Sequence, residues 1–177
     1  PSTLASITPI YPSNIVGVRT ASPIPLSSIK NQIPTANIYG GGNIFFKAND
    51  GTNGQELWTS NGTNEGTFMV KNISPGSGSS FPFDLTPMNN KLYFFAATPN
   101  ENNALWESDG TELGTTMIKD IKPGSGYSYV GNLININNTL YFAADDGTTG
   151  SELWKSDGTT NGTILVKDIN QTNTLTF

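Results

Sequence analysis

A tryptophan that recurs at one fixed interval constrains the fold more than any other feature of this chain. Trp58, Trp106 and Trp154 lie 48 positions apart, as the differences 106 − 58 and 154 − 106 show. Each follows a leucine and is separated by one residue from a Ser-(Asp or Asn)-Gly-Thr segment. A period near 50 residues without slippage is the signature of repeat architectures, whose units share a continuous core. The chain is therefore expected to fold as a row of similar units.

The copies align without insertions and divide the chain into an arm and a repeat domain. Residues 1–32 do not fit the repeat, and their prolines and short β-prone runs predict an extended N-terminal arm. Because the chain opens on Pro1 with no signal-peptide pattern, we expect a processed or trimmed product. Residues 33–177 make up the repeat domain, which consists of the repeats 33–80, 81–128 and 129–169 and the tail 170–177.

Each copy predicts four short β-strands. The second strand is a continuous apolar run, a pattern typical of a strand that is buried on both faces of its sheet. The third strand carries the Leu-Trp pair, whose side chains point to opposite faces, so that both faces need cover. The first, second and fourth strands are predicted at 33–39, 81–88 and 129–136, at 44–46, 92–96 and 140–144, and at 68–71, 116–119 and 164–167.

The connections between these strands contain residues that tolerate a positive φ. Gly or Asn pairs between the first two strands, and Asp-Gly or Asn-Gly after the third, predict tight hairpin turns. A lysine ends each fourth strand and is expected to face solvent, where charge discourages pairing between exposed sheet edges. The turns are 40–42, 89–90 and 137–138, then 61–62, 109–110 and 157–158, and the lysines are Lys71, Lys119 and Lys167.

Four strands per repeat and sheets covered on both faces predict an all-β, β-propeller-like array of three four-stranded blades. Propellers close with about four to eight blades, so three leave two blade faces without a partner. Two hypotheses follow for the terminal segments 1–32 and 170–177. They complete a fourth, composite blade within the chain, or one of them completes a neighbouring subunit by adding a strand to it.

The repeat also resembles a known family. Glu152-Leu153-Trp154-Lys155-Ser156-Asp157-Gly158-Thr159, followed by Gly162-Thr163 and by Val166-Lys167-Asp168-Ile169, is similar to the ELWxxDGT repeats of secreted bacterial surface proteins. The match covers residues 33–169. It departs from the pattern at Ala104, where the motif has Glu, and at Asn61 and Asn72, where it has Asp. The resemblance implies an extracellular, propeller-like repeat protein and implies no activity.

Composition excludes several classes of function. The formal net charge of −5 disfavours binding to nucleic acid, whose phosphates repel an acidic chain, and insertion into a membrane is not predicted because no apolar run is long enough. The chain has neither cysteine nor histidine. Disulfides, thiolate nucleophiles, Cys/His zinc sites and histidine-based acid–base catalysis are therefore excluded.

No catalytic, cofactor-binding or metal-binding residue is predicted. The Asp-Gly-Thr turns carry oxygen ligands of the kind that suits Ca²⁺, but turn chemistry alone accounts for them. Asp145 and Asp146 form a carboxylate pair that the other repeats lack. The three tryptophans are expected in the core rather than as platforms on which sugars stack.

The sequence therefore favours a non-enzymatic, extracellular structural or adhesive surface protein that requires no cofactor. One form of it is a filament or polymer subunit, assembled from identical chains by strand exchange. The alternative is a carbohydrate-binding, lectin-like propeller whose partners are surface glycans. The expected location is the bacterial cell surface or the medium around it.

Overall fold

The computed structural model describes residues 37–39, 43–99, 101–124 and 128–169, and all of the regular secondary structure within these ranges is β-strand. This confirms the predicted all-β class. The predicted arm 1–32 and the tail 170–177 lie outside the described residues. The described ranges contain no long apolar helix of the kind that crosses a membrane.

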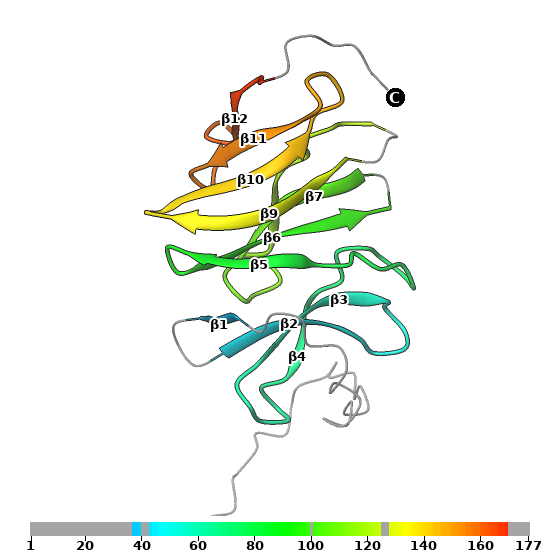
Figure 1. Ribbon diagram of the computed structural model, residues 1–177. Helices are drawn as coiled ribbons and strands as arrows, with labels where there is room; N and C mark the ends of the chain where they lie inside the picture. The colour runs from blue at the N-terminus through cyan, green and yellow to red at the C-terminus, as the bar shows by residue number, and fades with distance from the viewer. Residues whose placement is uncertain (1–36, 40–42, 100, 125–127, 170–177) are drawn as a thin grey trace, which may run out of the picture.

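The strands form three antiparallel sheets, in each of which strands that follow one another along the chain also pair side by side (Figure 1). Sheet 1 contains β1 (Asn37–Tyr39), β2 (Asn43–Asn49), β3 (Gln55–Ser60) and β4 (Phe68–Lys71). Sheet 2 contains β5 (Phe83–Met88), β6 (Lys91–Thr98), β7 (Glu101–Ser108) and β8 (Thr116–Lys119). Sheet 3 contains β9 (Val130–Ile136), β10 (Thr139–Asp145), β11 (Ser151–Ser156) and β12 (Ile164–Lys167).

Strand pairing preserves the repeat at the level of single residues. The fourth strands β4, β8 and β12 have the predicted bounds. In every sheet the tryptophan of the third strand lies opposite an aromatic residue of the second, in the pairs Phe46–Trp58, Phe94–Trp106 and Phe142–Trp154. The same side chains therefore point to the same side of each sheet.

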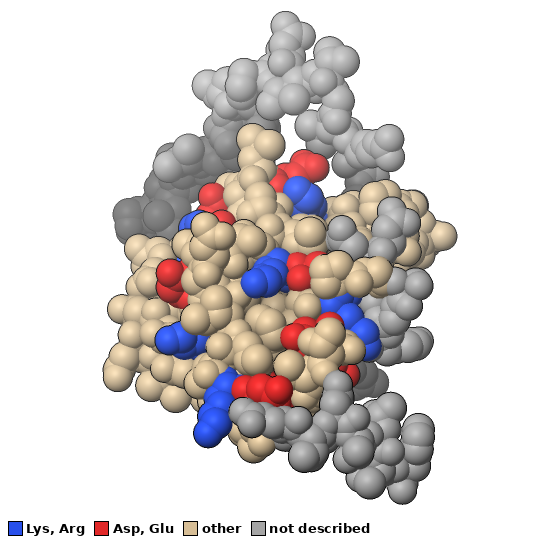
Figure 2. Space-filling model, turned by 90° about the horizontal axis from the view of Figure 1, so that it is seen from above, with Lys and Arg blue, Asp and Glu red and all other residues tan. Residues whose placement is uncertain are grey.

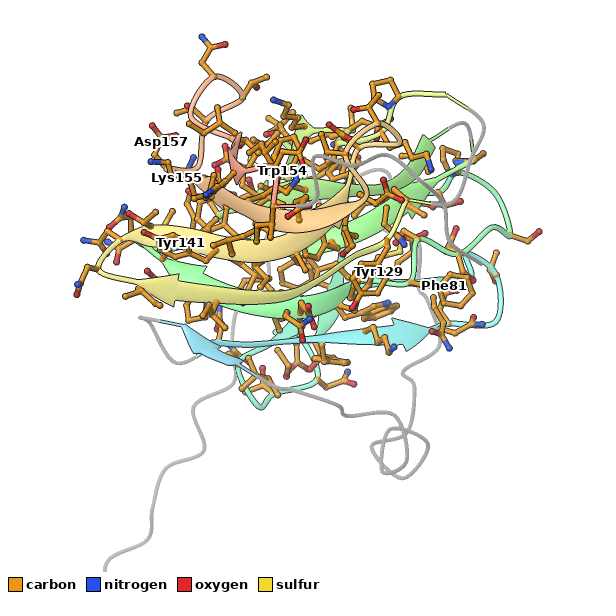
Figure 3. All side chains as sticks on the ribbon, turned by 45° about the horizontal axis from the view of Figure 1, so that its top comes forward. Phe81, Tyr129, Tyr141, Trp154, Lys155 and Asp157 are labelled. Atoms are coloured by element: carbon orange, nitrogen blue, oxygen red, sulfur yellow. The ribbon has the colours of Figure 1, made fainter. Side chains whose placement is uncertain are left out.

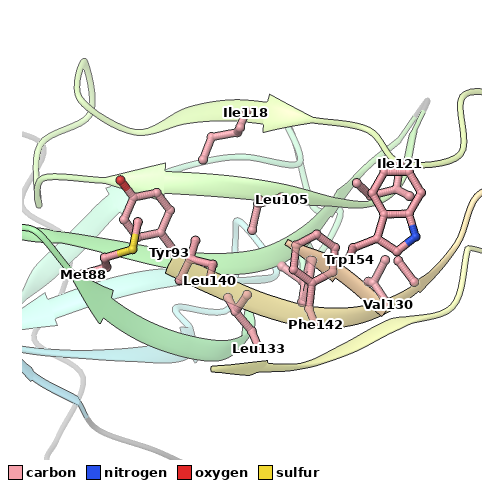
Figure 4. Packing of buried hydrophobic residues seen from close by; sticks show 12 residues of the cluster. Met88, Tyr93, Leu105, Ile118, Ile121, Val130, Leu133, Leu140, Phe142 and Trp154 are labelled. Atoms are coloured by element: carbon pink, nitrogen blue, oxygen red, sulfur yellow. The ribbon is translucent and has the colours of Figure 1, made fainter. Parts of the chain in front are cut away.

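The sheets stack face to face, and the Leu-Trp pair decides which side faces which neighbour. We call the side that carries the leucine the Leu face and the opposite side the Trp face. The Leu face of sheet 1 packs on the Trp face of sheet 2, through residues that include Leu57, Val70, Phe94 and Trp106. The Leu face of sheet 2 packs in the same way on the Trp face of sheet 3 (Figure 4).

Aromatic rings join sheets 2 and 3 across this second layer. The rings of Phe95 and Phe142 meet edge to face, with centroids 5.5 Å apart. Trp154 lies in the same layer and is buried, as are Trp58 and Trp106 in their sheets. The predicted core position of the three tryptophans is thus confirmed, and each buried indole removes a large apolar surface from water.

The prediction that every second strand is buried on both faces holds for the middle sheet and for Phe45 and Phe46 of β2, but not for sheet 3. Each residue of β6 from Leu92 to Ala96 is buried. In β10 the side chains alternate, and Tyr141 and Ala143 on the Leu face are only half-buried. The prediction was wrong for sheet 3 because no described sheet lies against its Leu face.

The hairpin turns between first and second strands are as predicted in sheets 2 and 3. Asn89 and Asn90 have φ values of 49° and 59°, and Asn137 and Asn138 have values of 51° and 60°. Positive φ at both central residues is the type I′ geometry, which matches the twist of the flanking strands. The corresponding residues 40–42 lie outside the described ones.

The connections between third and fourth strands are not tight hairpins, and this prediction was wrong. Gly62, Gly110 and Gly158 do adopt a positive φ, between 88° and 92°. However, β3 ends at Ser60 and β4 begins at Phe68, and the loops between third and fourth strands have seven residues, at 61–67, 109–115 and 157–163. The Asp-Gly pair opens a longer loop here rather than forming the whole turn.

Side chains of the motif hold these loops together. In the middle copy the carboxylate of Asp109 accepts hydrogen bonds from the backbone N–H and the hydroxyl of Thr111, at 2.8 and 2.7 Å. The Thr111 hydroxyl in turn accepts from the N–H of Gly114. The Thr115 hydroxyl donates to the Thr111 carbonyl and pairs with Ser108. The spaced Thr and Gly of the motif are therefore loop-closing residues.

Candidate functional site

The Leu face of sheet 3 is the strongest candidate for a functional site, because it is the exposed counterpart of two buried faces. Leu57 and Leu105, which cover neighbouring sheets, are fully buried, whereas Leu153 is 44% exposed. The isoleucine that follows the fourth strand shows the same contrast. Ile121 is 4% exposed and its counterpart Ile169 is 72% exposed. Side chains that form the core in two repeats therefore lie open on the third.

A second row of positions supports this contrast. Val70 and Ile118 are buried on the Leu faces of sheets 1 and 2, while the equivalent Val166 is 45% exposed. Figure 2 views the molecule from the side of sheet 3 and shows charged residues, several of them with the opposite charge beside them, among larger uncharged areas. Contiguous exposed apolar side chains on a folded protein commonly mark a surface that another molecule covers.

The lysines that end the fourth strands connect one repeat to the next. Lys71 Nζ donates to the carbonyl oxygens of Glu112 and Thr115, at 3.2 and 2.9 Å. Lys119 Nζ donates to the Thr163 carbonyl at 2.7 Å and lies 5.7 Å from the centre of the Trp154 ring. The predicted solvent-facing role was thus wrong for these two lysines, because loop carbonyls of the following repeat accept hydrogen bonds from their ammonium groups.

Lys167 occupies the same place at the end of sheet 3 and is exposed. Within the part of the chain that the structure describes, no hydrogen bond or ion pair joins its ammonium group to another residue. The Leu face of sheet 3 thus carries exposed leucine, valine and isoleucine side chains beside the ammonium group of Lys167. Lys71 and Lys119 donate to carbonyl oxygens of the next repeat, and no described residue accepts a hydrogen bond from Lys167 in this way.

A buried carboxylate holds the linker between sheets 1 and 2. Glu56 is fully buried and accepts hydrogen bonds from the backbone N–H groups of Ile73 and Ser74, at 3.0 and 3.1 Å. It also accepts one from the hydroxyl of Ser80, at 2.5 Å. Burial raises the pKa of Glu56, and the three donors offset part of that rise. The arrangement fixes the linker and offers no space for a substrate.

The paired carboxylates of the third repeat are also loop elements. Asp145 accepts a hydrogen bond from the N–H of Gly147. Asp146 Oδ1 accepts from the N–H groups and the hydroxyls of Thr148 and Thr149. Burial alone would raise the pKa of Asp146, but these hydrogen bonds outweigh it and lower the pKa to about 2. Across the described ranges, no three acidic, His or Cys side chains are grouped as metal ligands.

The tryptophans cannot serve as sugar platforms, because their rings are buried between or against sheets. Two exposed aromatic residues were missed by the sequence reasoning. Phe81 and Tyr129 are separated by the repeat period and are 54% and 56% exposed. Figure 3 shows both toward one end of the sheets, away from Tyr141 and Asp157. The sequence signal for these two residues was an aromatic residue at the start of the second and third repeats. The same pattern is expected of a residue in the first strand, so it did not indicate exposure.

Comparisons with known proteins identify no family. No family model matches the chain, and no curated protein matches it. Among solved structures, an α-L-arabinofuranosidase (CtGH43) from Clostridium thermocellum is similar over 72% of this chain and 48% of that chain, with 15% sequence identity and a TM-score of 0.29. The chain thus corresponds to about half the length of that protein. A TM-score this low supports no argument about the fold or activity of the present chain.

Proposed function

We propose that this chain is a non-enzymatic structural or adhesive protein of the extracellular surface, which assembles with copies of itself into a filament or another polymer. The observation that carries the proposal is the exposed Leu face of sheet 3. Its side chains belong to the same set that forms the core between the other sheets, and exposed apolar area of this kind favours association. The extracellular setting rests on the resemblance of the repeat to bacterial surface proteins.

We also propose that the three sheets are the blades of a propeller-like array. The first strands of sheets 2 and 3 approach closely enough for hydrogen bonds between them. Leu133 N–H donates to the Asp84 carboxylate at 3.1 Å, and the Thr86 hydroxyl donates to the Leu133 carbonyl at 3.0 Å. Four-stranded sheets that converge at their first strands are the arrangement of propeller blades around a central axis. The open ends of such an array would be its assembly surfaces.

Self-assembly of the purified protein tests this function. We expect sedimentation velocity over a hundredfold concentration series to show species larger than one chain, and electron microscopy to show their form. The physical reason is that the Leu face of sheet 3 gains cover only from another molecule or from the terminal segments. A strict monomer at the highest concentration would contradict the proposal and favour closure within one chain.

A carbohydrate-binding propeller is the second candidate, and the exposed Phe81 and Tyr129 favour it. Aromatic rings that are exposed at repeated positions can stack on the apolar faces of sugars. If they act in this way, a glycan array should detect binding that the Phe81→Ala/Tyr129→Ala double variant loses. Leu113→Ala is the matched control, because Leu113 is also apolar and is 92% exposed. An array with no binding above background would contradict the carbohydrate-binding function, and the structural role would remain as the proposed function.

A further inference from the structure

We propose that the Leu face of sheet 3 docks on the Trp face of sheet 1 of a second copy of this chain. The inference rests on the proposed self-assembly and specifies its surface and its partner. The interface between copies would repeat, residue for residue, the two interfaces that already join the sheets within one chain. The second copy is thus recognised as though it were a fourth repeat.

The Trp face of sheet 1 carries the side chains that this docking requires. In sheets 2 and 3 the second strand presents an aliphatic residue, a phenylalanine and an alanine on this face, and the third strand presents tryptophan. Sheet 1 presents the same chemistry at positions one or two periods earlier. The three sets are Leu140, Phe142, Ala144 and Trp154, then Leu92, Phe94, Ala96 and Trp106, then Ile44, Phe46, Ala48 and Trp58.

The two terminal faces differ in their present surroundings. Phe46, Ala48 and Trp58 are already buried, and the described side chains that pack on them, Ile44 and Met69, belong to sheet 1 itself. Docking therefore places a Leu face against a Trp face that is already buried, and removes little further apolar area of the Trp face from water. The net gain comes from the other partner, on which Leu153, Val166 and Ile169 lose their exposed area.

Polar contacts at the internal interfaces predict the register of docking. Lys71 Nζ reaches the Thr115 carbonyl, and Lys119 Nζ reaches the Thr163 carbonyl in the next repeat. By the same spacing, Lys167 of one copy would donate to the Thr67 carbonyl of the other. Since a cation on a backbone carbonyl forms a charge-assisted hydrogen bond, this contact would fix the angle between the copies as well as add affinity.

The register can be tested by cross-linking, because the chain has no native cysteine. Lys167→Cys protein is mixed with Thr67→Cys protein and treated with a short bismaleimide. We expect a covalent heterodimer that is at least about tenfold more abundant than in a mixture of Lys167→Cys with Thr52→Cys. Thr52 is exposed and lies in the loop between β2 and β3, whereas Thr67 lies in the loop between β3 and β4. The intramolecular pair Lys119→Cys/Thr160→Cys serves as the positive control for linker reach, because Thr160 is exposed and its hydroxyl donates to the Ile118 carbonyl at 2.7 Å.

A charge on the Leu face provides the second measurement. Leu153→Arg should raise the dissociation constant of the full chain about tenfold or more in sedimentation velocity, because arginine cannot be buried against the Trp face without a partner. Leu113→Arg, which adds the same charge on an exposed loop, should leave the constant unchanged. Circular dichroism checks that both variants fold, which is expected because neither leucine is buried.

The outcomes separate the docking surface from the proposed function. If the intact protein assembles but Leu153→Arg assembles equally well and the Lys167–Thr67 cross-link is absent, self-assembly stands and this interface is wrong. A donated N-terminal arm would then be the route of assembly. If the intact protein stays monomeric at every concentration, both the interface and the proposed polymer are wrong.

Discussion

Replacing Trp106 by alanine is expected to lower the free energy of unfolding by about 3–5 kcal/mol, the usual cost of truncating a buried aromatic residue. Trp106 is 7% exposed and packs in the layer between sheets 1 and 2 together with Leu57 and Phe94. Both of these neighbours lie in ordered strands, so the cavity is expected to collapse only in part. Urea unfolding followed by far-ultraviolet circular dichroism would measure the loss.

Phe68→Ala is the matched control, because this aromatic side chain is 47% exposed in β4 and contributes less buried area. Its substitution should cost less than about 1.5 kcal/mol, the lower end of the range for burying a large side chain fully. Equal losses for the two variants would mean that the layer between sheets 1 and 2 does not supply most of the stability of this region.

Replacing Glu56 by alanine should destabilise the protein by about 3 kcal/mol, because it leaves three hydrogen-bond donors without their acceptor at a buried position. The N–H groups of Ile73 and Ser74 and the hydroxyl of Ser80 would lose the carboxylate. Native-state hydrogen exchange should show faster exchange at these two amides in the variant. Glu65→Ala, on an exposed loop residue, should change neither quantity.

The pH dependence of this effect has a defined sign. The pKa of Glu56 is raised in the folded protein, chiefly by burial, above the ordinary value of 4.5. Protonation of Glu56 therefore stabilises the folded state at pH values below 4.5, and this contribution is lost as the pH rises through the raised pKa. The loss of stability in Glu56→Ala should thus be larger at pH 4 than at pH 8. The opposite trend would mean that the folded state prefers the ionised carboxylate.

The repeat period and the local patterns predicted a large part of this fold. The 48-residue interval gave the number of similar units, and apolar runs such as 92–96 placed the second strands. The pairing of Trp106 with Phe94 follows from the same period. These features were predictable because they depend on neighbours within one repeat or on the next one. Sheet 2, the one described sheet with a neighbouring sheet on each face, shows the expected burial.

Three features could not be read from the sequence. The Asp-Gly pairs have the composition of two-residue hairpins, but β7 ends at Ser108 and β8 begins at Thr116, and the contact between Ser108 and Thr115 closes this longer loop. The role of Lys119 depends on a carbonyl of another repeat, and backbone carbonyls leave no trace in a sequence pattern. The exposed Leu153 and the buried Leu105 occupy the same place in the Leu-Trp motif, and Leu105 is buried because another sheet covers its face.

Alanine at position 104 shows how one repeat replaces a structural contact. Ala104 stands where the first repeat has Glu56 and cannot accept hydrogen bonds through its side chain. In this repeat the N–H of Lys122 is instead accepted by the carboxylate of Asp120, at 3.0 Å. Asp120, at the start of the linker after sheet 2, thus supplies the acceptor for one of the donors that correspond to those bound by Glu56.

The shared register of the sheets bears on how chains of this kind can change in length. A gain or loss of 48 residues adds or removes one whole sheet and leaves a Trp face at one end and a Leu face at the other. A change of one residue within a strand would instead turn every following side chain of that strand to the opposite side of its sheet. Unequal recombination between repeats is thus the length change that the stack accepts most readily. Ancestors and descendants with different numbers of sheets would keep compatible ends.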